Sequence, residues 1–179
     1  LHKIKRDYNA NPLTLENTPD QPLALFSNWF EQTLKANLED PNAMVLATAD
    51  AQGIPDARIV LLKGVMDGKF IFYTNYGSAK GKQLSDNPHA ALNFFWPSFC
   101  RQIRIKGKVS KTSTSISDDY FASRPVDSQI GAIASKQSEV VTRKQLEKDV
   151  ENYAQSTQQP YNRPENWGGY CVTPESFEF

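Results

Sequence analysis

The sequence contains very little histidine and cysteine. Its 179 residues include two histidines, His2 and His89, and two cysteines, Cys100 and Cys171. His2 lies at the extreme N-terminus and His89 directly follows a proline, so neither is an evident base for Ser/His/Asp or Cys/His catalysis. The cysteines have no metal-ligand or redox spacing, and we expect buried thiols rather than a disulfide framework. No metal site is predicted, and an enzyme of this composition would depend on a bound organic cofactor.

The sequence also lacks net charge and a long apolar run. Lysine plus arginine and aspartate plus glutamate number 20 each, so no overall field would attract nucleic acid or an anionic membrane. No stretch approaches the ~20 apolar residues that cross a bilayer, and the N-terminal LHKIKRDY has no apolar core of the kind found in signal peptides. We therefore expect no nucleic-acid or membrane partner and a cytoplasmic location.

Short apolar segments separated by tight turns predict an α+β fold that is mainly antiparallel β, as a barrel or sandwich. We expect strands over residues 43–49, 69–74 and 89–96. In the segment that follows, Ile103 and Ile105 alternate with Gln102 and Arg104, which is the pattern of a strand with one buried face.

Two turn signals divide these segments further. Asp67-Gly68 lies between the apolar run 59–62 and the strand 69–74, and an Asp-Gly pair supplies the positive φ of a tight reversal. We therefore expect this run and this strand to form a hairpin. Near the C-terminus we expect a strand over 170–172, separated by Pro174 from a last strand over 176–179.

The N-terminal region predicts an arm followed by a helix. Residues 1–21 are polar and interrupted by prolines, so we expect a mobile arm before a single domain over residues 22–179. The helix begins at Pro22 and ends near Asp40, since proline suits the first helical turn. Its core-facing stripe is expected to comprise Leu23, Phe26, Phe30, Leu34 and Leu38.

Residues 115–156 predict three shorter helices. The first ends before Arg124-Pro125, because the residue before a proline avoids the helical region. Asp127 or Ser128 is expected to cap the second helix and Thr142 the third. The core face of the third is expected to comprise Leu146, Val150 and Tyr153.

The stretch from Asp56 to Lys82 combines cations with a turn that opens a helix. Arg58 and Lys63 bracket the apolar run, and Ser78 and Lys80 stand where the helix begins. Free N–H groups and the helix dipole favour an anion at such a point, so the stretch fits a phosphate site. It fits equally an ordinary hairpin that carries solvated lysines.

Six motifs occur in an order that resembles the pyridoxamine 5′-phosphate oxidase family. They are RIVLLK, FYTN, GSAK, SRPVDSQIGA, SKQS and WGGY, and the resemblance extends from about Lys5 to Phe179. The resemblance implies an FMN-binding split β-barrel and a homodimer with FMN at its interface. It also implies oxidation of pyridoxamine or pyridoxine 5′-phosphate by O₂ to pyridoxal 5′-phosphate, with release of H₂O₂.

The resemblance also implies which residues bind each ligand. For FMN they are Arg58, Ile59, Val60, Leu61, Leu62, Lys63, Tyr73, Thr74, Ser78, Lys80, Gln102, Gln137 and Ser138, the last two from the partner subunit. For the substrate they are Lys63, Tyr120, Arg124 and Ser128, with Arg6 and Tyr8 of the arm as part of a lid. Tyr120 and Arg124 share one helical face if that helix persists to Arg124. Without the resemblance, Tyr120 would be read as a core residue and Arg124 as a helix cap.

Two other functions stay open at this point. One is a split-barrel flavin reductase with another substrate, which does not account for Tyr120, Arg124 and Ser128 occurring together. The other is a non-catalytic module that binds FMN or pyridoxal phosphate. The sequence ends at Phe179, where the family continues with a flavin-contacting tryptophan and an arginine-x-histidine segment, so we expect further residues in the complete protein.

The turn GSAK departs from the family, which usually has two adjacent basic residues there, whereas this chain has Ala79 before Lys80. Because a hydrogen bond to a charged group contributes ~1.5 to 3 kcal/mol, Ala79→Arg is expected to tighten FMN binding by about one to two powers of ten. A fluorescence titration with FMN measures this. Unchanged affinity would show that another cation already serves in its place.

Overall fold

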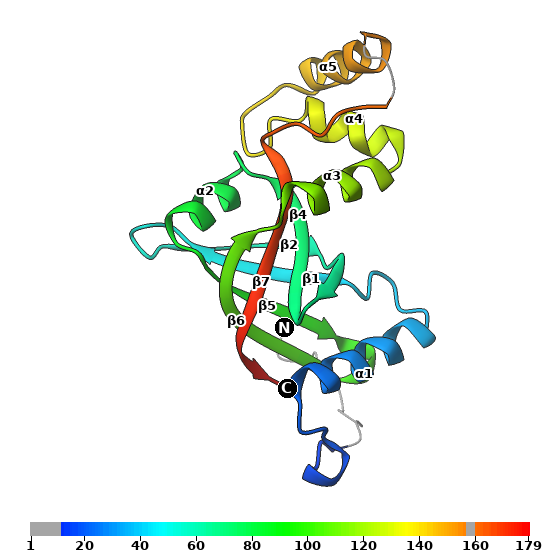
Figure 1. The fold of residues 1–179 in the computed structure, drawn as a ribbon, viewed down its shortest axis with the longest axis vertical. Coiled ribbons are helices and arrows are strands. Elements are labelled where there is room, and N and C mark those ends of the chain that lie inside the picture. The colour runs from blue at the N-terminus through cyan, green and yellow to red at the C-terminus, as the bar shows by residue number, and fades with distance from the viewer. Residues whose placement is uncertain (1–11, 157–159) are drawn as a thin grey trace, which may run out of the picture.

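The computed structural model describes residues 12–156 and 160–179, in which seven strands form one antiparallel sheet (Figure 1). The strands are β1 (Ala43–Ala49), β2 (Pro55–Leu61), β3 (Gly64–Met66), β4 (Lys69–Asn75), β5 (His89–Trp96), β6 (Arg101–Lys111) and β7 (Trp167–Glu178). Their order across the sheet is β2-β1-β5-β6-β7-β4-β3. The sheet curls around a core, which confirms the expected mainly antiparallel β fold.

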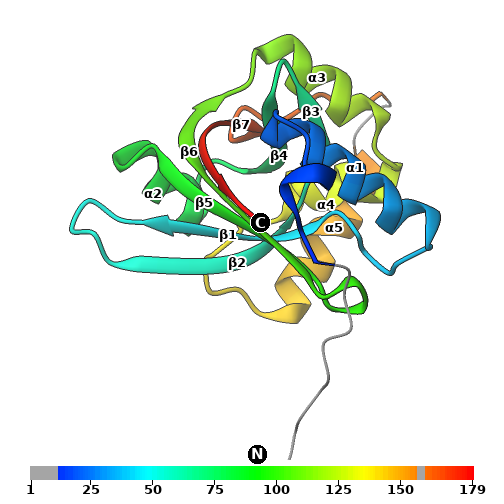
Figure 2. The ribbon, with the colours of Figure 1, turned by 90° about the horizontal axis from the view of Figure 1, so that it is seen from below.

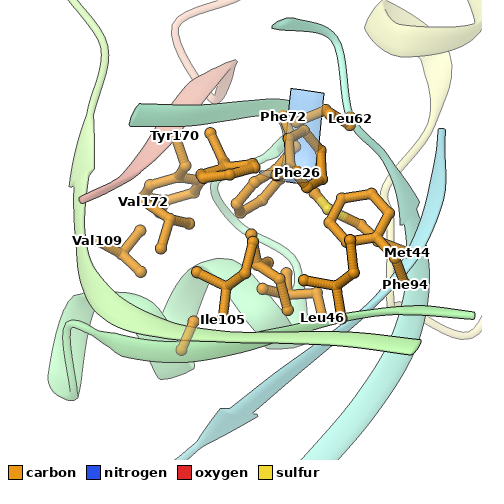
Figure 3. Close-up of a cluster of buried hydrophobic side chains, with 14 of the residues drawn as sticks. Phe26, Met44, Leu46, Leu62, Phe72, Phe94, Ile105, Val109, Tyr170 and Val172 are labelled. Atoms are coloured by element: carbon orange, nitrogen blue, oxygen red, sulfur yellow. The ribbon is translucent and has the colours of Figure 1, made fainter. Parts of the chain in front are cut away.

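Aromatic and aliphatic side chains from the inner face of the curled sheet form the core (Figure 3). Helix α1 (Pro22–Lys35) contributes Phe26, which is 2% exposed and meets the rings of Phe70 and Phe94 at centroid distances of 4.9 and 5.2 Å. Edge-to-face aromatic contacts of this kind add to the energy of area burial. Helix α1 therefore closes one end of the curled sheet, the end nearer the viewer in Figure 2.

Helix α1 is shorter than the sequence predicts. It ends at Lys35, and the chain turns through Asn37, which has a positive φ of 50°. Leu38 returns to the core after this turn, whereas Leu34 stays outside the core cluster and is 49% exposed. The predicted core role of Leu34 is therefore wrong, because α1 ends at Lys35 and none of the described core residues packs over its last turn at Leu34.

The Asp-Gly hairpin is present, but it joins different strands from those expected. Asp67 and Gly68 have φ values of 49° and 74° and connect β3 to β4. The run before them belongs to β2, which pairs with β1. The chain then crosses from one edge of the sheet toward the other. The Leu62 N–H donates to the Asn42 carbonyl, next to β1, and the Lys63 N–H donates to the Ile71 carbonyl of β4. This crossing draws β2 and β4 together.

The C-terminal segment is one strand, so the predicted division at Pro174 is wrong. Pro174 lies at a β-bulge, where the pairing with β6 shifts between Lys106 and Gly107. A bulge tolerates a proline, which has no N–H to donate. Gly107 is required there, because a Cβ would lie 2.1 Å from the Thr173 carbonyl oxygen.

The described residues contain four further α-helices, beside two short 3-10 helices, Leu15–Asn17 and Pro97–Phe99. The four α-helices are α2 (Ala79–Asp86), α3 (Thr114–Ser123), α4 (Val126–Ala134) and α5 (Arg143–Ser156). Helices α3, α4 and α5 gather at the end of the sheet opposite α1 (Figure 1). Within the described ranges no helix is both long enough and apolar enough to span a membrane.

The helix caps partly follow the sequence. Thr142 caps α5 as predicted, since its hydroxyl accepts a hydrogen bond of 3.2 Å from the Gln145 N–H. The predicted cap of α4 is wrong, because Pro125 is the N-cap residue and its carbonyl accepts from the Ser128 N–H. The predicted core face of α5 is also wrong in part, since Leu146 is 36% and Tyr153 40% exposed.

The closure of the core by α1 gives a stability test. Phe26→Ala is expected to lower the free energy of unfolding by about 3 to 5 kcal/mol, because it leaves a cavity among three aromatic rings. Leu34→Ala on the same helix should cost less than about 1 kcal/mol, since Leu34 is exposed. Urea denaturation compares the two variants. Equal losses would contradict this packing.

Candidate functional site

A cavity of about 820 Å³ opens between β2, β4 and the helices α3 and α4. Twelve residues that the sequence assigned to ligands line it: Arg58, Ile59, Val60, Leu61, Lys63, Tyr73, Thr74, Lys80, Tyr120, Arg124, Ser128 and Gln137. No aspartate or glutamate is among its lining residues in the described part of the chain. The volume suits a small organic ligand.

The remaining assigned residues lie elsewhere. Leu62 is buried in the core, and Ser78 is fully buried at the start of α2. Gln102 is exposed on β6 and does not line the cavity. Arg6 and Tyr8 lie outside the described residues.

The N-terminus of α2 forms one end of the cavity. The Ser78 hydroxyl caps this helix by accepting from the Gly81 N–H at 3.3 Å. A side chain at Gly81 would collide with the Tyr76 carbonyl, since a Cβ would lie 2.1 Å from its oxygen. The turn is therefore tight, and it places Lys80 toward the cavity.

Lys80 is a buried cation at this end. It is 6% exposed, and its Nζ lies 3.4 Å from the Ser78 hydroxyl. Within residues 12–156 and 160–179 it forms no ion pair. Burial, and then the nearby charge of Arg58, lowers the pKa of Lys80, against a smaller opposing effect of Asp56. A bound anion would relieve this cost.

Arg58 stands beside Lys80 and is held by its neighbours. Its Nη1 donates to the Thr48 hydroxyl at 2.6 Å and to the Leu46 carbonyl at 3.1 Å. Its Nη2 lies 2.5 Å from an Asp56 carboxylate oxygen. The hydrogen bond from Gln83 and the charge of Arg58 hold the pKa of Asp56 below its usual value. The guanidinium is thus fixed in one orientation.

Arg124 is a second cation, set apart from the first. Its guanidinium carbon lies 4.7 Å from the centre of the Trp167 ring, a cation–π contact. Its Nη1 is buried and has no hydrogen-bond partner in the described part of the chain. Burial lowers the pKa of Arg124, and the partial charge of Tyr120 opposes this. An unsatisfied buried donor is costly, so this group also favours an anion.

The chain geometry around Arg124 differs from the expected helical face. Helix α3 ends at Ser123, and Arg124 is extended, with φ −74° and ψ 149°. Tyr120 stacks on Tyr73 of β4, with ring centroids 3.8 Å apart and an interplanar angle of 15°. Tyr120 and Arg124 therefore reach the same cavity because the chain turns before Pro125.

The SKQS segment lies against its own chain. The Gln137 side-chain oxygen accepts from the Thr74 hydroxyl at 3.2 Å. The Ser138 hydroxyl accepts from the Ala79 N–H at 3.2 Å. The resemblance assigned Gln137 and Ser138 to the site of a partner subunit, whereas in this structure Gln137 lines the cavity of its own chain and Ser138 contacts the first residue of α2.

Several cavity residues were not assigned from the sequence. Asn75 and Trp167 line the cavity, and both belong to the motifs FYTN and WGGY, which could have identified them. Ser135 lies in SKQS and its carbonyl accepts from Asn75 at 3.4 Å. Thr48 and Gln83 hold Arg58 and belong to no motif, so nothing in the sequence pointed to them.

The lining residues have the chemistry that FMN and a second anionic ligand require. Lys80, Arg58 and the N-terminus of α2 could hold the FMN phosphate through charge-assisted hydrogen bonds. Residues 59–61 of β2 and the apolar atoms of Thr74 could border a flat ring. Arg124, Tyr120 and Ser128 remain for another anionic ligand.

Comparison with known proteins identifies close relatives. The family model described as pyridoxamine 5′-phosphate oxidase matches residues 30–156. A pyridoxine/pyridoxamine 5′-phosphate oxidase of Legionella pneumophila (strain Lens) is 49% identical over 184 residues, which cover 100% of this chain and 84% of the relative. A protein of the same name from Paraburkholderia phymatum is 49% identical over 181 residues, which cover 100% of this chain and 85% of the relative.

Two solved structures share the fold. PhzG from Burkholderia lata, in complex with tetrahydrophenazine-1-carboxylic acid, has a TM-score of 0.87 and 28% identity, and the match covers 94% of this chain and 85% of PhzG. A pyridoxamine 5′-phosphate oxidase-related, FMN binding protein from Nostoc punctiforme has a TM-score of 0.70 and 16% identity, covering 88% and 82%. The expected split-barrel fold is confirmed.

The burial of Lys80 predicts opposite effects on stability and binding. Folding lowers the pKa of Lys80 below its ordinary value of 10.5. Between the folded-state pKa and 10.5, the unfolded chain binds more protons than the folded chain. The free energy of unfolding therefore rises with pH over this range. Lys80→Met should remove this rise and stabilise the ligand-free protein at neutral pH by about 1 kcal/mol, while weakening phosphate binding.

The measurement is urea denaturation without ligand at pH 7 and above pH 9, for the variant and the wild type. Lys82→Met is the matched control, because Lys82 is an exposed lysine of the same helix and should leave stability nearly unchanged. A Lys80→Met variant less stable than the wild type at neutral pH would contradict this account of the buried charge.

Proposed function

Because the chain belongs to the pyridoxamine 5′-phosphate oxidase family, we propose that it oxidises pyridoxine or pyridoxamine 5′-phosphate to pyridoxal 5′-phosphate, using FMN and O₂ and releasing H₂O₂. The observation that carries the proposal is a pair of cationic groups, the buried Lys80 with Arg58 and the partly buried Arg124, in one cavity without lining carboxylates in the described residues. Two separate phosphates match two separate cationic groups.

The first group would hold the FMN phosphate. Lys80 supplies positive charge in the first turn of α2, where the helix dipole also favours an anion, and Arg58 on β2 also lines the cavity. When bound, FMN supplies the hydride acceptor, and O₂ then restores its oxidised form. Residues 59–61 would lie along the ring and exclude water from one side of it.

The second group would hold the phosphate of the substrate. Arg124 offers a buried donor without a partner, and Tyr120 and Ser128 line the same part of the cavity. Lys63 also lines the cavity and could contact either ligand. No histidine and no carboxylate lines the cavity in the described residues, so these side chains would act mainly by holding the reacting carbon over the ring.

A homodimer is part of this proposal. Ile59 on β2 is 63% and Phe95 on β5 61% exposed, and a partner subunit would cover these two apolar side chains. Gln102 lies on the strand next to Phe95 and away from the cavity of its own chain. In a dimer, Gln102 would contact the flavin ring bound by the partner subunit.

One solved neighbour supports a second candidate substrate. PhzG is 28% identical and its structure contains a reduced tricyclic acid. The stacked rings of Tyr73 and Tyr120 could face such a flat ligand. This alternative needs only the FMN phosphate site. The buried donor of Arg124 would then bind the carboxylate of the tricyclic substrate.

The experiment reconstitutes the protein with FMN and adds pyridoxine 5′-phosphate in air. We expect aldehyde and peroxide to form in equal amounts. Bleaching of the flavin only by a nicotinamide donor would indicate a reductase, and bound flavin without turnover would indicate a binding module. Turnover of a reduced phenazine carboxylic acid but of neither vitamer phosphate would favour the second candidate.

The role of Arg124 can be tested separately. Arg124→Gln is expected to raise KM for pyridoxine 5′-phosphate by about 10- to 100-fold, because it removes charge-assisted hydrogen bonds to the phosphate. The activity toward unphosphorylated pyridoxine should change little. Arg143→Gln is the matched control, since the Arg143 side chain is 91% exposed on α5. Equal losses with both substrates would contradict a phosphate-binding role.

A further inference from the structure

Neither Thr48 nor Gln83 lines the cavity, yet the side chains of both accept hydrogen bonds from Arg58. We propose that they are positioning residues, which hold the Arg58 guanidinium ready beside Lys80 and so set the preference for a phosphorylated flavin. The inference rests on the proposed function, because it assumes that Arg58 and Lys80 face the FMN phosphate.

The donors of Arg58 are almost fully used by the protein itself. Nη1 donates to Thr48 and to the Leu46 carbonyl, at 2.6 and 3.1 Å. Nη2 donates to the Gln83 side-chain oxygen at 3.1 Å and pairs with Asp56 at 2.5 Å. Only Nε has no partner in the part of the chain that the structure describes. The guanidinium can therefore present one N–H and its charge without changing its orientation.

Gln83 is the centre of this arrangement. Its oxygen accepts from the Thr48 hydroxyl at 2.6 Å as well as from Arg58, and its nitrogen donates to Asp56 at 3.2 Å. The side chains of Thr48, Asp56, Arg58 and Gln83 therefore hold one another in fixed orientations. Thr48 is 4% exposed, so water does not compete for its hydroxyl. The group joins β1, β2 and α2 by side chains alone.

The position of Gln83 on α2 links the two cations. Lys80 and Gln83 are three residues apart on this helix, so they lie on neighbouring positions of one face. The helix that supplies Lys80 therefore also fixes Arg58. Because the rotamer of Arg58 is already restricted, little side-chain entropy is lost when an anion binds. Asp56 offsets part of the Arg58 charge, and this leaves Lys80 as the main uncompensated charge.

The experiment compares FMN with riboflavin, which has the same ring but no phosphate. Binding of each is titrated by fluorescence to the full-length apoprotein. Thr48→Val and Gln83→Met keep the shape of each side chain but remove its hydrogen bonds. Each is expected to weaken FMN binding by about tenfold and to change riboflavin binding by less than about twofold.

Two control variants separate positioning from packing. Thr48→Ser keeps the hydroxyl and should restore FMN affinity to within about twofold of the wild type. Thr33→Val removes another fully buried hydroxyl, one that donates to the Phe30 carbonyl in α1. It should leave the affinities for both flavins unchanged.

Each result decides the inference. A loss that is confined to FMN, and that serine reverses at position 48, supports it. An equal loss for FMN and riboflavin, or no loss in either variant, overturns it. A wild-type protein that does not prefer FMN to riboflavin also overturns it, whatever the protein oxidises. A wild type that prefers FMN but oxidises neither vitamer phosphate overturns the proposed function alone.

Discussion

The structure depends on positive charge that is buried without a matching carboxylate. Lys80 is almost fully covered, and Arg124 has a buried donor with no partner in the described residues. Folding alone gives no reason to bury these groups, because burial disfavours their charged forms. A ligand that brings negative charge to both points would recover the cost. The two cations are therefore better explained by binding than by stability.

The curled sheet explains how the two cationic groups come to share one cavity. The crossing at Leu62 and Lys63 brings β2, one edge of the curled sheet, close to β4 near the other edge. Arg58 reaches the cavity from β2, and Lys80 from the helix that follows β4. Arg124 reaches the cavity from the point where the chain turns after α3. The strands and helices that carry these side chains pack against the core or against one another, so the side chains are placed before any ligand binds.

Local patterns in the sequence predicted much of the fold. The alternation in β6, the Asp-Gly turn and the cap at Thr142 depend on neighbouring residues, and all are present. Patterns among neighbouring residues do not predict which strands pair. The run before Asp67-Gly68 pairs with β1 because of a long-range crossing, and Pro174 continues a strand because Gly107 opposite it permits a bulge.

In the site, too, local motifs predicted some residues and missed those that depend on long-range contacts. Motifs supplied most residues that line the cavity, including Arg58, Lys80 and Arg124. They did not supply Thr48 and Gln83, since the side chains of these residues hydrogen-bond to other side chains and belong to different elements. Their relation to Arg58 exists only in three dimensions, so a single sequence contains no signal for it.

The central claim is that two phosphates bind at separate buried cationic positions. Phosphorus NMR of the protein with FMN and pyridoxal 5′-phosphate tests it most directly. A free phosphate monoester changes its shift with a pKa of about 6. The account predicts two bound resonances, both independent of pH between about 5.5 and 8, because each dianion is held by buried cations. A single bound resonance, or two that titrate as the free ligands do, would contradict it.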